Sequence, residues 1–355
     1  MKRYLTYPMI QAILAAALFG ASAPLAKLML GNIEPVPLAA FLYLGSGLGL
    51  LLFNVLFKKH TRPGGEARIS KADLPWLSGA VIAGGVAAPI ILMFSLRYTP
   101  AATASLLLNF EGVATTLIAA LVFKEAIGRR IWLAIGAVTV ASIMLSLDFK
   151  GEWGFSLSAL GVLSACVLWG IDNNFTRNIS AKDPLSITTI KGLGAGTFSL
   201  VLAALLGNTF PGALVIAKAM LLGCFGYGVS IVLFILAMRN LGAARASVFF
   251  GTAPFVGTVI SFLLFREKSN AQFILVIPIM ILGVALLLNE NHAHKHNHAA
   301  IQHEHRHSHD DAHHLHQHDD GVTVTDCIHD HVHTHEPIEH DHDHTPDIHH
   351  RHGHS

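Results

Sequence analysis

Residues 99–126, TPAATASLLLNFEGVATTLIAALVFKEA, align without gaps on residues 241–268, LGAARASVFFGTAPFVGTVISFLLFREK. Both stretches open with Ala-Ala-x-Ala-Ser and end with phenylalanine, a basic residue and glutamate. A second, shorter similarity pairs residues 17–27 with residues 167–177. Similarity that recurs at a nearly constant offset is the mark of an internal repeat, so the chain is predicted to be a duplicated unit.

The composition around these stretches is that of a membrane protein. Hydrophobic residues make up 52% of the 355 residues and charged residues only 13%. A membrane-spanning helix needs about 20 mostly apolar residues. Ten runs of this kind are predicted, at residues 9–30, 36–57, 74–97, 100–123, 131–148, 155–177, 186–207, 213–238, 242–265 and 271–289.

Five of these spans fall in each copy of the repeat. Because five is odd, the copies insert in the membrane with opposite orientation, which is typical of inverted-repeat transporters. We therefore expect an all-α polytopic membrane protein with ten transmembrane helices in an inverted 5+5 arrangement. The first unit is residues 1–148, the second is residues 149–290, and residues 291–355 form a disordered tail.

Basic residues predict the orientation of the chain. With a cytoplasmic N-terminus, the inner loops and span ends hold 14 Lys or Arg and the outer ones hold five. This bias agrees with the positive-inside rule. An even number of spans then places the tail in the cytoplasm as well, and the expected location is the cell (inner) membrane.

The order of short motifs resembles a known family. The Ala-Ala-x-Ala-Ser openings, the Phe-basic-Glu endings, Trp169-Gly170 and the proline after the first and sixth spans resemble the EamA branch of the drug/metabolite transporter superfamily. The resemblance covers residues 9–289 and implies secondary transport, usually export, with the substrate held between the two halves. Together with the tail, it resembles the nickel and cobalt resistance exporters of that superfamily.

Glu111 is the first candidate for a functional residue. It lies near the middle of the fourth predicted span, where a charged carboxylate costs about 2.5 kcal/mol or more. Its partner in the repeat is Ala253, so folding of the unit does not require a carboxylate there. We expect Glu111 to carry protons or bind metal, with Asn109 beside it. The alternative is a neutral carboxyl that is hydrogen-bonded to a neighbouring helix.

Asp172 and Lys191 lie at similar depth in the sixth and seventh predicted spans. An ion pair between them would neutralise two costly charges. Asn173 and Asn174 follow Asp172 and are included in the candidate transport and proton-coupling site. The pair is equally compatible with a purely structural role. A further carboxylate, Glu267, closes the ninth span beside basic residues and is expected to anchor a helix end, as is Glu125 in the first copy.

The tail is a histidine tract. It contains 23 of the 24 histidines, with 12 Asp or Glu among them. Imidazoles and carboxylates at this spacing are typical ligands of Ni, Co and Zn. The candidate metal ligands are His292, His294, His296, His298, His303, His305, His307, His309, His313, His314, His316, His318, His329, His331, His333, His335, His340, His342 and His344.

These features favour a proton-coupled exporter of a divalent transition metal, nickel or cobalt first, that is not an enzyme and has no obligatory cofactor. No nucleotide-binding motif is present, which favours proton coupling. The alternative is an exporter of a small organic metabolite or drug whose tail only buffers metal. The expected partners are the lipid bilayer and the transported solute, without nucleic acid; a homodimer stays open.

Overall fold

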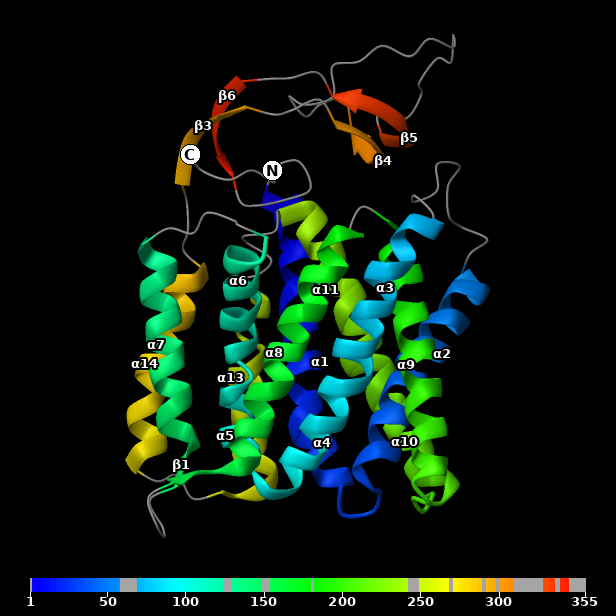
Figure 1. Cartoon of the computed structure of the whole chain (residues 1–355), viewed down its shortest axis with the longest axis vertical. Helices are drawn as coiled ribbons and strands as arrows, with labels where there is room; N and C mark the ends of the chain where they lie inside the picture. The colour runs from blue at the N-terminus through cyan, green and yellow to red at the C-terminus, as the bar shows by residue number, and fades with distance from the viewer. Residues whose placement is uncertain are drawn as a thin grey trace.

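The computed structural model describes residues 2–57, 69–123, 129–148, 154–179, 182–241, 249–267, 271–288, 292–297, 301–308, 328–335 and 339–344. The described residues between 2 and 288 form a bundle of helices that run nearly parallel to one long axis (Figure 1). Helix α1 begins and helix α14 ends at the same end of this bundle. That arrangement agrees with an even number of passes through the bundle.

The first half consists of helical segments of varied length. They are α1 (Lys2–Met29), α2 (Pro35–Phe57), η2 (Lys71–Asp73), α3 (Leu74–Ala80), η3 (Val81–Ala87), α4 (Ala88–Tyr98), α5 (Ala101–Leu107), α6 (Phe110–Leu121) and α7 (Arg129–Ser146). Strands β1 (Leu147–Asp148) and β2 (Gly154–Phe155) pair antiparallel after α7, a short hairpin that the sequence did not predict.

The second half has its long helices in a similar order. It contains α8 (Leu157–Asn178), α9 (Pro184–Leu205), α10 (Ala213–Gly223), η4 (Cys224–Val229), α11 (Ser230–Leu241), α13 (Ala253–Phe265) and α14 (Ala271–Leu288). Residues 242–248, the start of the predicted ninth span and of the repeat's second Ala-Ala-x-Ala-Ser motif, lie outside the described residues.

Seven helical segments among the described residues are long and apolar enough to cross a membrane. They run Pro8–Met29, Pro35–Val55, Lys71–Tyr98, Ala101–Leu121, Arg129–Ser146, Pro184–Leu205 and Ala213–Phe234. The chain is therefore a multi-pass membrane protein with an all-helical core. The other three predicted spans coincide with α8, which carries six polar residues near its end, and with the described parts of α13 and α14, which are shorter.

Helix irregularities recur in the two halves. Segments η3 and η4 are π-helical, with wider turns than an α-helix, and they begin at residues 81 and 224. A second interruption separates α5 from α6 at residues 108 and 109, and its counterpart precedes α13 at residues 251 and 252. The predicted fourth span is thus two helices, α5 and α6, rather than one. No glycine or proline marks the break at residues 108 and 109.

Helices from the two halves pack in corresponding pairs. Helix α2 packs against α9, and α7 packs against α14, so equivalent helices of the repeat meet. Helix α1 packs on α11 and α13, while its counterpart α8 packs on α4 and α6. Each of these contacts thus has a counterpart made by the corresponding helices of the other half.

Glycines allow the backbones of α2, α9 and α10 to approach closely. A Cβ atom on Gly223 would lie 1.8 Å from the carbonyl oxygen of Leu42, and one on Gly45 would lie 2.0 Å from that of Met220. Between α2 and α9, Gly47 and Gly192 face each other with the same lack of space. Small residues at helix contacts are how membrane helices gain van der Waals packing without a hydrophobic driving force.

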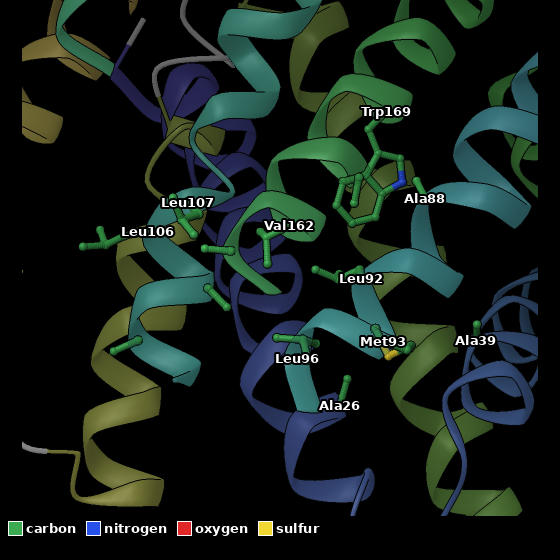
Figure 2. Close-up of a cluster of buried hydrophobic side chains, with 14 of the residues drawn as sticks. Ala26, Ala39, Ala88, Leu92, Met93, Leu96, Leu106, Leu107, Val162 and Trp169 are labelled. Atoms are coloured by element: carbon green, nitrogen blue, oxygen red, sulfur yellow. The ribbon is translucent and has the colours of Figure 1, made fainter. Parts of the chain in front are cut away.

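The core of the bundle lies where α4, α5 and α8 meet. Figure 2 shows its side chains, which are fully or nearly fully buried: Leu92, Leu96, Leu106, Leu107, Val162 and Trp169. The start of α5 is fixed by the second half, because the carboxylate of Glu267 accepts hydrogen bonds from the backbone N–H groups of Ala101 (2.6 Å) and Ala102 (3.0 Å). The predicted anchoring role of Glu267 is confirmed; Glu125 lies outside the described residues.

Parts of the histidine tract form strands, which differs from the tail without regular structure that we expected. Strand β3 (His292–Asn297) pairs antiparallel with β6 (Glu339–His344), and β4 (Ile301–Ser308) pairs antiparallel with β5 (Ile328–His335). The alternation of histidine with other residues has the period of two that suits an extended strand. The predicted ligands His298, His309, His313, His314, His316 and His318 lie outside the described residues.

Candidate functional site

Glu111 lies at the middle of a spanning segment. It is the eleventh residue of the 21-residue segment Ala101–Leu121 and belongs to the first turn of α6, directly after the break at residues 108 and 109. The N-terminal end of a helix carries a partial positive charge, which favours a carboxylate there. The break therefore provides in the bundle interior a helix end at which an acidic residue is tolerated.

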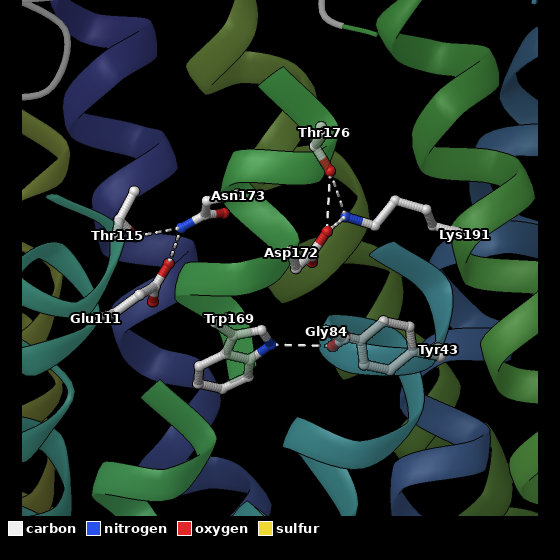
Figure 3. Close-up of polar contacts among 9 residues, drawn as sticks. All are labelled: Tyr43, Gly84, Glu111, Thr115, Trp169, Asp172, Asn173, Thr176 and Lys191. Carbon is white, nitrogen blue, oxygen red and sulfur yellow. Dashed lines mark hydrogen bonds and ion pairs between the residues drawn. The ribbon is translucent and has the colours of Figure 1, made fainter. Parts of the chain in front are cut away.

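A neighbouring helix of the other half holds the Glu111 carboxylate. The side-chain amide of Asn173, on α8, donates a hydrogen bond of 2.9 Å to Glu111 Oε1 and lies 3.1 Å from the hydroxyl of Thr115 (Figure 3). Within the described residues, no cation lies at ion-pairing distance from Glu111. The carboxylate of Glu111 is therefore held by a neutral amide.

Asp172 lies one residue before Asn173 and is paired with a charge. Lys191 Nζ, on α9, lies 2.5 Å from Asp172 Oδ1, and the Thr176 hydroxyl donates to the same oxygen at 2.9 Å. Lys191 Nζ also lies 3.2 Å from the Thr176 hydroxyl. The side chains of Asp172 and Lys191 are only 8% and 17% exposed. The ion pair predicted from their matching depth is confirmed.

The carbonyl oxygen of Gly84 lies beside this ion pair, in η3. It accepts hydrogen bonds from Tyr43 Oη on α2 at 2.7 Å and from Trp169 Nε1 on α8 at 3.0 Å (Figure 3). Tyr43 and Trp169 are both buried. Three helical segments thus meet at one backbone atom next to Asp172.

The two other predicted asparagines serve the helices rather than Glu111. Asn109 is buried, and its amide donates to the carbonyl of Leu106 at 3.0 Å, in the turn that ends α5. The Asn174 amide donates to Gly170 O at 2.8 Å and to Thr115 O at 3.0 Å, so it joins α8 to α6. Of the three asparagines, the structure places only Asn173 against Glu111.

The charged residues of the polar site are absent from the corresponding positions of the other half. The equivalent of Glu111 is Ala253, which is buried at the start of α13, and the shorter repeat aligns Asp172 with Ser22. The pairs of packed helices are nevertheless the same around both positions. The charges are therefore an addition to a frame that folds without them.

A metal centre is not formed by the side chains that the structure describes, because no three His, Cys, Asp or Glu among them come together. The side chains of the histidine tract are not among those described. The predicted metal ligands therefore stay a prediction, as does metal binding at Glu111.

The end of the bundle opposite the start of α1 carries a second polar contact between the halves. Glu34, between α1 and α2, accepts hydrogen bonds from the hydroxyl (2.9 Å) and backbone N–H (3.3 Å) of Thr209 and from the amide of Asn208. The Thr209 hydroxyl is the main cause that holds the pKa of Glu34 below its usual value. A cavity of about 230 Å³ lies beside it, lined in part by Arg97 and Phe210.

Comparison with known proteins agrees with this architecture. The sequence model of the EamA-like transporter family matches the chain twice, at residues 6–147 and 156–289. The chain belongs to the EamA-like transporter family. The family lies within the drug/metabolite transporter superfamily, so this EamA protein is a membrane transporter that acts in the lipid bilayer on a transported substrate.

Individual relatives of this EamA protein are also transporters. It is 27% identical over 293 residues to an uncharacterized transporter of Methanothermobacter thermautotrophicus, which covers 78% of this chain and 85% of that protein. It is 28% identical over 210 residues to a probable terminal-alkyne amino-acid exporter of Streptantibioticus cattleyicolor, covering 58% and 70%. A solved protein crystal structure superposes with a TM-score of 0.58 at 14% identity, over 79% of this chain and 95% of that one, which shows a shared fold.

Four residues of the site were not predicted from the sequence as functional: Thr115, Thr176, Tyr43 and Gly84. The two threonines lie four residues from Glu111 and Asp172 on the same helices, and this spacing places side chains on one helix face. Helical spacing could therefore have found them. Tyr43 and Gly84 carry no comparable signal, because their role depends on contacts between helices that are distant in sequence.

Proposed function

We propose that the chain is a secondary transporter that exports a divalent transition metal ion, Ni or Co, in exchange for protons. The observation that carries the proton-coupling step is the contrast between the two carboxylates of the polar site. Asp172 is paired with Lys191 at 2.5 Å, whereas Glu111 is held by the neutral amide of Asn173.

Glu111 is the proton carrier in this proposal. A carboxylate held only by neutral donors can take up a proton without leaving a cation unpaired in the membrane. Such intramembrane carboxylates are typical of proton relays. Its position at the middle of Ala101–Leu121 supports this role, because a carrier at that depth is equally distant from both ends of the segment.

Asp172 and Lys191 are the responsive pair. Asp172 lies on α8 next to Asn173, and Lys191 lies on α9. A change in the contact of Glu111 with Asn173 can therefore be transmitted to the ion pair through α8. A cation that approached Asp172 would compete with the Lys191 ammonium for the same oxygen. The pair can therefore open when the solute enters and close when it leaves.

The proposal includes ten membrane crossings in two inverted units of five. Three observations support it: the recurrent π segments, the matching breaks before α6 and α13, and the corresponding helix pairs. Two matches of the same family model add to them. Alternating access then occurs by movement of packed helices around a central site.

The histidine tract supports a metal as the solute. In the proposed orientation both termini face the cytoplasm of a cell with the protein in its inner membrane, so the tract lies on the side from which an exporter collects its cargo. Its candidate ligands would bind Ni, Co or Zn without a strict preference, because affinity follows the general metal order. The tract would raise the local metal concentration at the entrance.

An organic solute is the second candidate. It is favoured by the similarity to a probable terminal-alkyne amino-acid exporter. In that case the tract buffers cytosolic metal and does not serve transport. Deleting residues 292–355 separates the two: a metal exporter loses apparent affinity for its ion, whereas an exporter of organic solutes keeps its rate.

The test uses the purified full chain in proteoliposomes with a nickel-sensitive dye inside and an imposed pH gradient. With the parent chain, we expect nickel to enter the liposomes while protons leave them down the imposed gradient. We expect no such nickel movement with Glu111→Gln. Asp73→Asn is the matched control, since this carboxylate lies in η2, outside the polar site. Absence of nickel and cobalt movement by the parent chain contradicts metal transport; full activity of Glu111→Gln contradicts its proton role.

A further inference from the structure

The carbonyl oxygen of Gly84 receives neither the backbone donor of an α-helix, four residues on, nor that of a π-helix, five residues on. In η3 the turns are wide, and the N–H of Ala88 donates five residues back, to Ala83 O. The residue five positions after Gly84 is Pro89, which has no N–H. The π segment and the proline together leave a backbone acceptor free inside the bundle.

A buried carbonyl without a hydrogen-bond donor destabilises the folded protein, and two side chains donate hydrogen bonds to the carbonyl of Gly84. Tyr43 Oη (2.7 Å) and Trp169 Nε1 (3.0 Å) both lie at normal hydrogen-bond distance from it. A carbonyl oxygen accepts two hydrogen bonds, so its capacity is filled. Through this one atom, α2 and α8 are fixed to η3.

The packing around Gly84 also requires that this residue has no side chain. A Cβ atom at this position would lie 1.9 Å from Asp172 Oδ2 and 2.4 Å from Asp172 Cβ. No conformer of alanine avoids this, because the Cβ position is set by the backbone. The Asp172 carboxylate therefore lies directly against the bare backbone of η3, three residues along α8 from Trp169.

We propose that Gly84 is a positioning residue for the Asp172–Lys191 pair. Its bare Cα gives the carboxylate its place, and its free carbonyl fixes the two neighbouring helices through Tyr43 and Trp169. The inference rests on the proposed role of Asp172 in transport, and it assigns the function of the π segment. Figure 3 shows Gly84, Tyr43 and Trp169 together beside Asp172.

The second half supplies an internal comparison. By the offset of the repeat, Gly226 corresponds to Gly84 and Ile231 to Pro89, and Ile231 has an N–H group. A Cβ on Gly226 would lie 3.1 Å from the Cβ of Ser22, the residue that aligns with Asp172. The close approach thus recurs, but the proline and the carboxylate occur together only beside η3.

The experiment is a double-mutant cycle on the full chain in lipid nanodiscs. Trp76, Trp132 and Trp153 are replaced by Phe, so that Trp169 is the remaining tryptophan fluorophore. Gly84→Ala is then compared in the parent and in the Asp172→Ala background, by Trp169 emission and melting temperature. Gly194→Ala is the matched control on α9, because its Cβ would lie 3.6 Å from the Val81 side chain, an ordinary contact.

We expect Gly84→Ala to shift Trp169 emission and lower the melting temperature in the parent, and to lose most of both effects when Asp172 is alanine. Coupling of this kind is what residues in direct contact show. Folding of Gly84→Ala only in the Asp172→Ala background also supports the proposal. Equal effects in both backgrounds, or failure to fold in both, overturns it.

Transport gives the second measurement. With nickel in proteoliposomes, Gly84→Ala is expected to reduce the rate about 10- to 100-fold, the scale seen when a group that orients a ligand is lost. Tyr43→Phe removes one of two donors and is expected to reduce the rate about two- to tenfold and to shift its pH dependence. An unchanged pH dependence in Tyr43→Phe contradicts positioning through the carbonyl. If the parent chain moves no nickel, the proposed function fails, while the fluorescence cycle still tests Gly84.

Discussion

The amide of Asn173 on α8 lies 2.9 Å from the carboxylate of Glu111 on α6, so the second half of the chain holds the acidic residue of the first. On the same helix, Asp172 is directed to Lys191 on α9. Two adjacent residues of α8 thus contact opposite sides of the bundle. A small rotation of α8 would alter both contacts at once, which couples them mechanically.

Asn173→Ala is expected to reduce nickel transport in proteoliposomes while the protein still folds. The carboxylate of Glu111 loses a hydrogen bond of a kind that contributes about 1.5–3 kcal/mol when one partner is charged. Thr116→Val is the control, since this hydroxyl bonds only within α6, to Gly112 O. Equal rates for the Asn173 and Thr116 variants would remove Asn173 from the mechanism.

Lys191→Met is expected to destabilise the protein by about 3 kcal/mol, because Asp172 is then left buried and unpaired. The double variant Lys191→Met, Asp172→Leu should recover most of that loss, since no lone charge remains. Melting temperatures in nanodiscs measure both. If the double variant were less stable than Lys191→Met alone, the pair would contribute more than charge neutralisation.

Gly223→Val is expected to cost about 3 kcal/mol or more, the upper range of overpacking, because the added atoms meet the backbone of α2 rather than a mobile side chain. Gly136→Val, in α7, is the comparison, since a Cβ there has no atom within 4 Å. Unfolding in detergent, followed by circular dichroism, gives the difference. Similar losses at the two positions would contradict the close contact of α10 with α2.

Glu34 predicts a pH dependence of stability at the end of the bundle opposite the start of α1. Its pKa is lowered from 4.5 in the folded protein, mainly by the Thr209 hydroxyl. The stability from its hydrogen bonds is therefore fully present above pH 4.5 and is lost as the pH falls below that value through the folded pKa. The melting temperature of the parent minus that of Glu34→Gln should be constant from neutral pH to pH 4.5 and shrink below it. A melting-temperature difference that grows on acidification would contradict the lowered pKa of Glu34.

The sequence predicts best those features of this protein that follow from the composition of each helix and from depth in the membrane. Apolar runs give the helices, and equal depth from one membrane face brings Asp172 to Lys191. The break at residues 108 and 109 was missed because Leu108 and Asn109 carry no helix-breaking signal. The helices on either side of it contact α13 and α8, which are distant in sequence. Gly84 was missed for a similar reason, since its two donors lie 41 and 85 residues away.

The strands of the histidine tract show another limit of composition. Low hydrophobicity and dense charge predict a chain without fixed structure. The alternating pattern of the tract also has the period of a β-strand. The four strands β3, β4, β5 and β6 follow this pattern and pair antiparallel, β3 with β6 and β4 with β5. Composition and periodicity gave opposite answers for the same residues.

The tight glycine contacts join α2 of the first half to α9 and α10 of the second, with backbones nearly touching. Surfaces this close cannot slide past one another without separating, so these three helices form one stiff block. A boundary of motion must then lie elsewhere, where side chains and not backbones make the contact. In the transport cycle that we propose, this block therefore moves as one body, and it contains helices from both halves of the chain.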